Sequence, residues 1–159
     1  MKKVIINKAT AKDLNELAQL ALALRKNQDK ISGLTSYTST AQYKKYYTGL
    51  FRKQLRSKQS LLLVARKDKK IIAYLFGIIK DMPAYHVRKN IGFINEAFVA
   101  KNYRRQGVLK ILLKELFIWF KSKKINRVEL SVFINNQVGK TSWHKAGFKE
   151  YRYICQRKI

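Results

Sequence analysis

The chain has few of the residues that build cysteine or metal sites. Its single cysteine, Cys155, excludes an internal disulfide and most cysteine-based metal centres. The two histidines, His86 and His144, are far apart in the sequence, so a zinc site is not expected either. We therefore expect no metal, and chemistry that uses oxygen, nitrogen and backbone groups.

Long apolar runs are also lacking. No run approaches the roughly 20 residues that a membrane-spanning helix needs. The first ten residues, MKKVIINKAT, hold only three consecutive apolar residues, which does not fit a signal peptide. These absences predict a cytoplasmic protein without a membrane partner.

Acidic residues are scarce. Nine Asp and Glu face 35 Lys and Arg, which gives a formal net charge of +26. Such a charge attracts polyanions and speeds encounters with anionic ligands. The basic residues are scattered along the whole chain, so a general lysine bias explains them as well as proximity to RNA or the ribosome does. Both explanations remain open at this point.

The 159 residues suit one domain, taken as residues 1–159, and 47% of them are hydrophobic. Alternating and helical apolar patterns predict a mixed order of elements. Strands are expected at residues 2–9, 60–67, 71–80, 91–100, 127–134 and 148–158. Helices are expected from the Thr10 cap onward and at residues 41–57, 108–123 and 135–148, with loops at 27–40 and 81–90. This order predicts an α/β fold with a central, mixed but mostly antiparallel sheet flanked by about four helices.

The segment YRRQGVLKILLKEL, from Tyr103 to Leu116, places positive charge and a glycine where a helix begins. A helix start exposes unpaired backbone N–H groups and the positive end of the helix dipole. Gly107 would let an anion approach the backbone, while Arg104, Arg105 and Lys110 supply charge. The spacing fits neither a P-loop nor GxGxxG, so the segment alone predicts only an anion site.

Two segments together resemble the GNAT superfamily of acetyl-CoA-dependent N-acetyltransferases. The family's loop reads Arg or Gln, two residues, Gly, one residue, then Gly or Ala, and Arg104, Gly107 and Leu109 occupy those places. Its second segment is a strand, an Asn, a short helix, an aromatic position and Gly-Phe. Here these are residues 128–133, Asn136, Trp143 and Gly147 with Phe148. The motif-level similarity covers about residues 91–150, and the first ninety residues match only in the order of elements.

The resemblance implies a single-domain GNAT-like fold and acetyl-CoA as co-substrate. Backbone amides around the loop would hold the coenzyme A pyrophosphate, and residues 93–100 would bind the pantetheine arm in an opening between two splayed strands. Asn136 would hold that arm from the other side. The implied coenzyme residues are Phe98, Val99, Arg104, Arg105, Gln106, Gly107, Val108, Leu109, Lys110 and Asn136.

Two positions depart from the family pattern. Leu109 replaces a small residue and is tolerable if its side chain points into the core. Trp143 stands where many members have the tyrosine that protonates the leaving thiolate, and an indole N–H is not a usable acid. By chemistry alone, the other candidates for the general acid are Tyr103, Tyr151, Tyr153 and His144.

Glu96 is the one acidic residue in the strand IGFINEAFV, among apolar neighbours. Such a carboxylate can have a raised pKa and accept a proton from the acceptor amine through water. A purely structural pairing with a basic residue is nearly as good an explanation. The Tyr43, Tyr46 and Tyr47 cluster would either wall the acceptor site or simply pack a helix.

The sequence therefore favours an enzyme that moves the acetyl group to a primary amine by direct attack in a ternary complex. Two alternatives stay open: a basic RNA- or ribosome-binding module without catalysis, and a sensor that binds coenzyme A. The acceptor could be a small molecule, a protein amine or an aminoacylated RNA. Polycationic acceptors rank lower, because they need several carboxylates. A dimer is possible, and the sequence does not decide the oligomeric state.

Overall fold

A computed structural model describes residues 4–34, 39–87 and 89–157. Residues 2, 3 and 158 of the expected strands, and residues 35–38 and 88 of the expected loops, lie outside this described part. The described elements are β1 (Ile5–Lys8), a 3₁₀ turn (Ala11–Asp13), α1 (Leu14–Ser32), α2 (Thr40–Leu55), β2 (Ser60–Lys67), β3 (Lys70–Asp81), β4 (Asn90–Val99), a second 3₁₀ turn (Lys101–Tyr103), α3 (Val108–Ser122), β5 (Val128–Leu130) and α4 (Gln137–Lys145).

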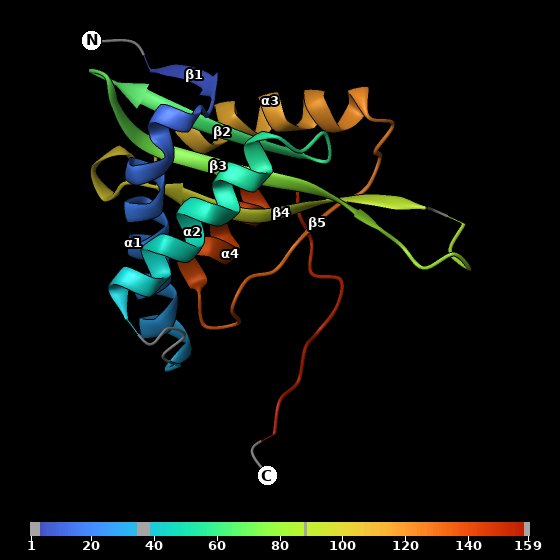
Figure 1. Cartoon of the computed structure of the whole chain (residues 1–159). Helices are drawn as coiled ribbons and strands as arrows, with labels where there is room; N and C mark the ends of the chain where they lie inside the picture. The colour runs from blue at the N-terminus through green and yellow to red at the C-terminus, as the bar shows by residue number, and fades with distance from the viewer. Residues whose placement is uncertain (1–3, 35–38, 88, 158–159) are drawn as a thin grey trace.

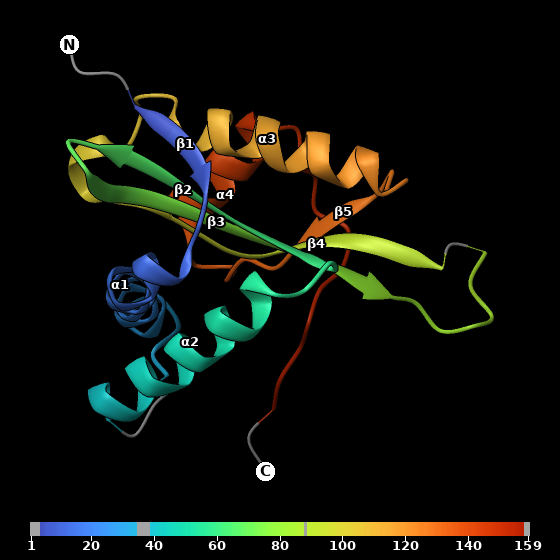
Figure 2. The ribbon, with the colours of Figure 1, turned by 45° about the horizontal axis from the view of Figure 1, so that its top comes forward.

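The five strands form one sheet in the order β1-β2-β3-β4-β5. The first three pairings are antiparallel, and β4 pairs with β5 in parallel. Helices α1 and α2 cover one face of the sheet, and α3 and α4 lie on the other (Figures 1 and 2). The expected α/β architecture, with its mixed, mostly antiparallel sheet and four helices, is confirmed.

Two apolar cores hold these layers together, because strands β2, β3 and β4 are covered on both faces. One core joins α1 and α2 to the sheet through fully buried side chains such as Leu17, Phe51 and Tyr74. The other joins α3 to the opposite face through Leu112, Leu116 and others. Strands buried on both faces read as continuous apolar runs, which explains the sequence of β2 and β3.

The hairpin between β2 and β3 turns through Asp68 and Lys69, with φ of 52° and 68°. Two successive positive φ angles are typical of the turn that matches the right-handed twist of paired strands. The expected reversal at this point is therefore confirmed, although neither residue is a glycine.

Three sequence expectations are wrong. The predicted loop at 27–40 is helical as far as Ser32, because Gly33 at φ 71° ends α1 only there. The predicted strand at 127–134 is paired only at Val128–Leu130. The tail predicted as a strand at 148–158 forms none in its described residues 148–157. A strand needs a partner edge as well as a suitable sequence, and the last two segments lack that partner in the described chain.

Candidate active site

The sheet opens beside the middle of β4. Only Gly92–Ile94 of β4 pair with β5, whereas Asn90–Val99 pair with β3. The register with β3 shifts where Phe76 faces Glu96 and Gly77 faces Ile94, which leaves Asn95 as an extra residue. A bulge of this kind bends a strand and redirects its side chains. The opening therefore begins at the bulge, and the remaining length of β4 borders it.

Glu96 follows the bulge and points toward α2. Its two carboxylate oxygens accept hydrogen bonds from the Tyr47 hydroxyl at 2.5 Å and the Tyr74 hydroxyl at 2.8 Å. Glu96 is 8% exposed, and Tyr74 is fully buried. The two hydroxyls fix the carboxylate in one orientation, because each holds a different oxygen.

The surroundings of Glu96 change its acidity. Burial raises the pKa of Glu96, while hydrogen bonds from Tyr47 and Tyr74 and the positive charge of Arg25 oppose part of this rise. Burial and the negative charge of Glu96 in turn raise the pKa values of both tyrosines. The tyrosines stay protonated and donate, which offsets only part of the effect of burial, so the pKa of Glu96 remains above that of an exposed glutamate.

The three tyrosines of α2 differ in their burial. Tyr43 and Tyr47 are buried and stack with ring centroids 4.4 Å apart, whereas Tyr46 is 64% exposed. Tyr47 thus combines ordinary helix packing with the contact to Glu96. The sequence does not predict Tyr74 as a partner of Glu96. The only local indication is that Tyr74 places a hydroxyl in the middle of an otherwise apolar strand.

Beyond β4 the chain forms a tight basic loop. The Nε–H of Arg104 donates to the Val99 carbonyl at 3.0 Å, and the side-chain amide of Gln106 donates to the Asn102 carbonyl at 2.8 Å. Arg105 at φ 62° and Gly107 at φ 78° both lie in the left-handed region. Gly107 is the N-cap of α3, so the amides at the helix start follow it directly.

The residues of the basic loop and of the first turn of α3 differ in their exposure to solvent. Arg104, Arg105, Gln106 and Lys110 are exposed, while Val108 is 3% exposed and belongs to the α3-face core. Leu109 is half-buried and packs against the same core. The side chain of Leu109 therefore points toward the core, which is the condition under which a bulky residue is tolerable at this position.

Asn136 lies between β5 and α4. Its side-chain oxygen accepts the Gly139 N–H at 2.9 Å, which caps α4. A Cβ on Gly139 would come within 2.6 Å of the Asn136 amide, so the glycine makes room for this cap. Asn136 therefore caps α4, and its contact with coenzyme stays a prediction.

Trp143 of α4 packs edge-on against Phe148, with ring centroids 5.6 Å apart, and against the α3-face core. Packing thus accounts for an indole at this position. Among the other candidate acids, His144 lies 2.9 Å from the Glu150 carboxylate, while Tyr151 and Tyr153 are more than 70% exposed in the tail. Tyr103 is half-buried near the basic loop, with the Lys67 ammonium 5.5 Å from its ring centroid.

The end of β4, which contains Glu96, Phe98 and Val99, is followed in the sequence by the basic loop and then by the start of α3. Phe98 faces the α1–α2 side and stacks on Tyr74, whereas Val99 faces the α3 side. One continuous stretch thus combines a buried carboxylate, an open strand edge and a helix start with exposed basic residues.

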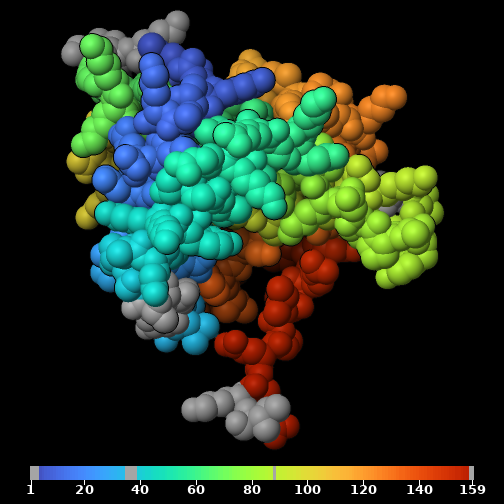
Figure 3. Space-filling model, viewed as in Figure 1, coloured from blue at the N-terminus to red at the C-terminus, as the bar shows by residue number. Residues whose placement is uncertain are grey.

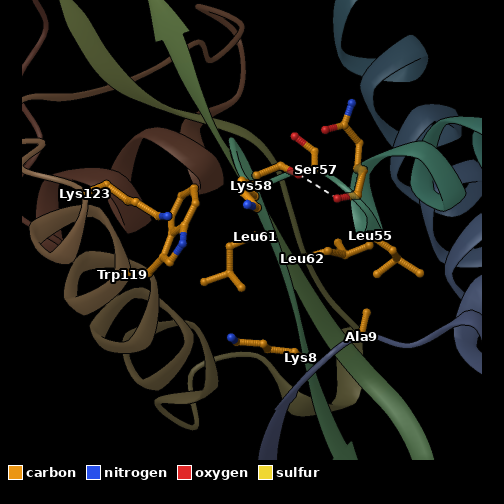
Figure 4. Close-up of a pocket in the computed structure, with 11 residues that line it drawn as sticks. Lys8, Ala9, Leu55, Ser57, Lys58, Leu61, Leu62, Trp119 and Lys123 are labelled. Atoms are coloured by element: carbon orange, nitrogen blue, oxygen red, sulfur yellow. Dashed lines mark hydrogen bonds between the residues drawn. The ribbon is translucent and has the colours of Figure 1, made fainter.

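A separate pocket of about 230 Å³ lies near the other edge of the sheet, where β2 meets the C-terminal ends of α2 and α3. Figure 4 shows Lys8, Lys58, Lys123 and Trp119 around it. Its volume is below the roughly 300–1,000 Å³ of typical ligand pockets, and its lining includes none of the predicted site residues. We therefore assign it no role in the site.

No helix in the described residues is long and apolar enough to span a membrane. Among solved structures, the chain is similar to a mutant of the BH1408 protein from Bacillus halodurans, with 20% identity, a TM-score of 0.81, and 98% and 99% of the two chains covered. It is similar to a predicted acetyltransferase with acetyl-CoA from Clostridium acetobutylicum, with 21% identity, a TM-score of 0.78, and 98% and 96% covered. It is also similar to the aminoglycoside antibiotic 6′-N-acetyltransferase AAC(6′)-Ih from Acinetobacter baumannii, with 19% identity, a TM-score of 0.77, and 99% and 98% covered.

At such identities these structures show a shared fold. No curated protein matches the chain. A family model described as "Acetyltransferase (GNAT) family" matches residues 26–148, which is well over half of the chain and includes β4, the basic loop and α4. The chain therefore belongs to the GNAT family of acetyltransferases.

Proposed function

We propose that the protein acetylates a primary amine by direct attack on acetyl-CoA within one ternary complex. Membership of the family makes it an acetyl-CoA-dependent N-acetyltransferase. The observation that carries the proposal is the continuity of the open edge of β4 with the basic loop and the start of α3.

The residues fit the coenzyme. A Cβ placed on Gly107 would meet no described atom within 4 Å, so the space above this backbone is open to a ligand. The amides of residues 106–110 and the dipole of α3 would bind the pyrophosphate, with Arg104, Arg105 and Lys110 as counter-charges. The free edge of β4 past Asn95, including Phe98 and Val99, would bind the pantetheine arm, and Asn136 would lie on its other side.

Glu96 would act as the base. An amine must lose its proton before it attacks, and a carboxylate with a raised pKa accepts a proton more readily than an ordinary one. Because both oxygens are already hydrogen-bonded and buried, the proton would pass through water. The amine nitrogen then bonds to the acetyl carbon as the carbon–sulfur bond breaks. The nitrogen releases its remaining extra proton to water to give the amide, and the released thiolate takes a proton from solvent.

The acceptor we propose is an amine that is not a polycation. Glu96 and Asp13 are the described acidic side chains that are buried, and Asp13 pairs with Arg66 at 2.8 Å. The net charge of +26 repels polycations and attracts anionic carriers. A small amino compound, a protein amine on an RNA-rich assembly or an aminoacylated RNA fits this charge better than an aminoglycoside does.

The test is calorimetric titration with acetyl-CoA, using protein freed of nucleic acid. The ligand control is the 3′-phosphorylated adenine nucleotide that lacks the pantetheine arm. Gly107→Glu should weaken acetyl-CoA binding at least about tenfold, because it adds a carboxylate beside the bound pyrophosphate and strains a residue at φ 78°. Gly49→Glu is the matched control, since Gly49 lies in α2 with no described atom within 4 Å of an added Cβ.

Preferential one-to-one binding of acetyl-CoA, lost in the Gly107 variant alone, would support the proposal. Equal and salt-sensitive uptake of acetyl-CoA and the nucleotide would support the RNA-binding alternative instead. Specific coenzyme binding without transfer to any amine of a varied panel would support the sensor alternative.

A further inference from the structure

Arg25 interrupts the apolar face of α1. The buried residues of this helix share one face: Leu14, Leu17, Ala18, Ala21 and Leu22. Arg25 lies four positions after Ala21, so it belongs to the same face, and it is half-buried. Arginine side chains are seldom buried without a partner, so the contacts of Arg25 indicate what it does at this position.

The face of α1 that carries Arg25 meets α2. The Tyr43 hydroxyl of α2 donates to the Ala21 carbonyl at 3.2 Å, about one turn before Arg25. The ribbon and space-filling views show α2 packed against α1 over the same face of the sheet (Figures 1 and 3). Partial burial lowers the pKa of Arg25, but hydrogen bonding to the Tyr43 and Tyr47 hydroxyls outweighs burial and raises it overall. The guanidinium therefore lies beside both tyrosine hydroxyls.

Tyr47 connects Arg25 to the proposed base. Its hydroxyl donates to a Glu96 carboxylate oxygen at 2.5 Å, and its ring stacks on Tyr43 with ring centroids 4.4 Å apart. A hydroxyl oxygen that accepts a hydrogen bond from a cation donates its own proton more strongly. Arg25, Tyr47 and Glu96 therefore form one polar network that runs from α1 through α2 to β4.

Arg25 also brings positive charge to this network. The described titratable groups that interact with Glu96 are Tyr43 and Tyr47 from α2, Tyr74 from β3 and Arg25 from α1. Of these groups only Arg25 is a cation. Neutral hydroxyls offset the cost of burying the carboxylate in part, whereas an opposite charge stabilises the ionised form directly.

We propose that Arg25 is a positioning residue for Glu96: it holds Tyr47 in place and supplies the positive charge that keeps the buried carboxylate ionised. A base must be ionised before it can accept a proton, so this role bears on the deprotonation of the acceptor amine. That consequence for catalysis rests on the proposed function. The coupling between Arg25 and Glu96 does not, and it is measurable in protein without any substrate.

The first experiment measures the ionisation of Glu96 directly by carbon NMR. The chain has only five glutamates, so protein labelled with ¹³C at the glutamate carboxyl gives few signals, and Glu96→Gln identifies the one from Glu96. Arg25→Met removes the charge but keeps an apolar side chain in place of the arginine stem. It should raise the titration midpoint of Glu96 by at least about half a pH unit, because a nearby opposite charge lowers a carboxyl pKa by roughly 1 to 3.

Further variants separate the charge of Arg25 from a general disturbance of α1. Arg25→Gln is a second neutral variant and should shift the midpoint in the same direction, so the test does not depend on one substitution. Arg25→Lys keeps the charge and should remove at least about half of the shift. Lys26→Met, which removes an exposed cation from the same helix, is the matched control and should leave the midpoint within about 0.2 pH unit.

Equal midpoints in Arg25→Met and Lys26→Met would overturn the proposal. A shift that Arg25→Lys does not reduce would overturn it as well, since the charge would then not be the cause.

The second experiment is the pH profile of kcat/KM with the most active amine of a varied panel. The acid limb of this profile reports the ionisation of the base in the free enzyme. In Arg25→Met the limb should move to higher pH by the same interval as the NMR midpoint, while KM for the amine above the limb stays within about twofold.

A raised KM with an unmoved NMR midpoint would mean that Arg25 binds the acceptor itself, and it would overturn the positioning role. If no amine is acetylated, the proposed function fails, whereas the NMR midpoint still decides for or against Arg25. The two failures are therefore distinguishable.

Discussion

The two edges of β4 differ in a way that separates stability from function. On the β3 side, pairing runs from Asn90 to Val99 and continues through β2 to β1. On the β5 side, pairing stops at Ile94, one residue before the bulge. The closed edge anchors the strand, and the open edge leaves backbone groups available to a ligand. A single strand thus supplies both a rigid support and the proposed binding surface, and substitutions on its two sides should have different effects.

The largest effect is expected from Glu96→Gln. Removing the proposed base should lower kcat by about 100-fold or more, because general-base assistance typically contributes 10²–10⁴-fold. Acetyl-CoA binding should stay within about twofold, since Glu96 points toward α2 and not toward the basic loop. Steady-state kinetics and calorimetry on the same preparation would measure both quantities. An unchanged kcat would leave Glu96 with a structural role only.

Gly92→Ala tests the closed part of β4, where both neighbouring strands pair. A Cβ there would approach the buried Phe120 ring to 2.8 Å, so the ring or the strand must move. Overpacking of this kind costs typically about 1–3 kcal/mol. Denaturant unfolding should show this loss. Gly49→Ala, in a helix with open space, should instead stabilise the protein by up to about 1 kcal/mol.

Sequence patterns predicted the closed part of the sheet well and the open part poorly. The apolar runs of β2 and β3 identify them directly, since burial on both faces leaves a local signature. Nothing local to Glu96 indicates its contacts with Tyr47 and Tyr74, which are 49 and 22 residues away in the chain. Residues 148–157 show the converse: their alternation predicts a strand, but pairing depends on an edge that the alternation does not supply.

The basic loop shows where a local pattern is enough. The helix start and the exposed charges around Gly107 follow from residues that are adjacent in the sequence, and the structure has both. The width of the opening does not follow in this way, because it depends on a bulge that appears only when β4 is set against β3.

The pH dependence of stability isolates the carboxylate at the open edge. Because burial raises the folded-state pKa of Glu96 above its unfolded value, the native state binds this proton more tightly than the unfolded state does. The contribution of Glu96 to the free energy of unfolding is therefore full below the unfolded pKa. It falls as pH rises through the interval between the two values, by about 1.4 kcal/mol per unit of separation. Glu96→Gln should lack this fall.

Chemical denaturation of both proteins across the acid range would measure that difference. Asp13 contributes in the opposite direction. Partial burial raises its pKa, but the Thr10 N–H and Arg66 together outweigh burial, so the pKa is lowered overall. The stabilisation by Asp13 is therefore lost as pH falls. The double variant Asp13→Asn with Glu96→Gln should therefore show a weaker pH dependence of the free energy of unfolding in the acid range, because both opposing contributions are removed. Parallel curves for wild type and Glu96→Gln would contradict the raised pKa.

The smallest effect concerns Asn136, whose cap and coenzyme roles can be separated by two variants. Asn136→Ala removes the acceptor of the Gly139 N–H and should cost about 1 kcal/mol in denaturant unfolding. Asn136→Asp keeps an acceptor and should restore that stability. If the side chain also borders the coenzyme, the added negative charge should weaken acetyl-CoA binding in the Asp variant although the helix is capped. Normal binding by Asn136→Asp would restrict Asn136 to capping and would leave β4 and the basic loop as the binding surface.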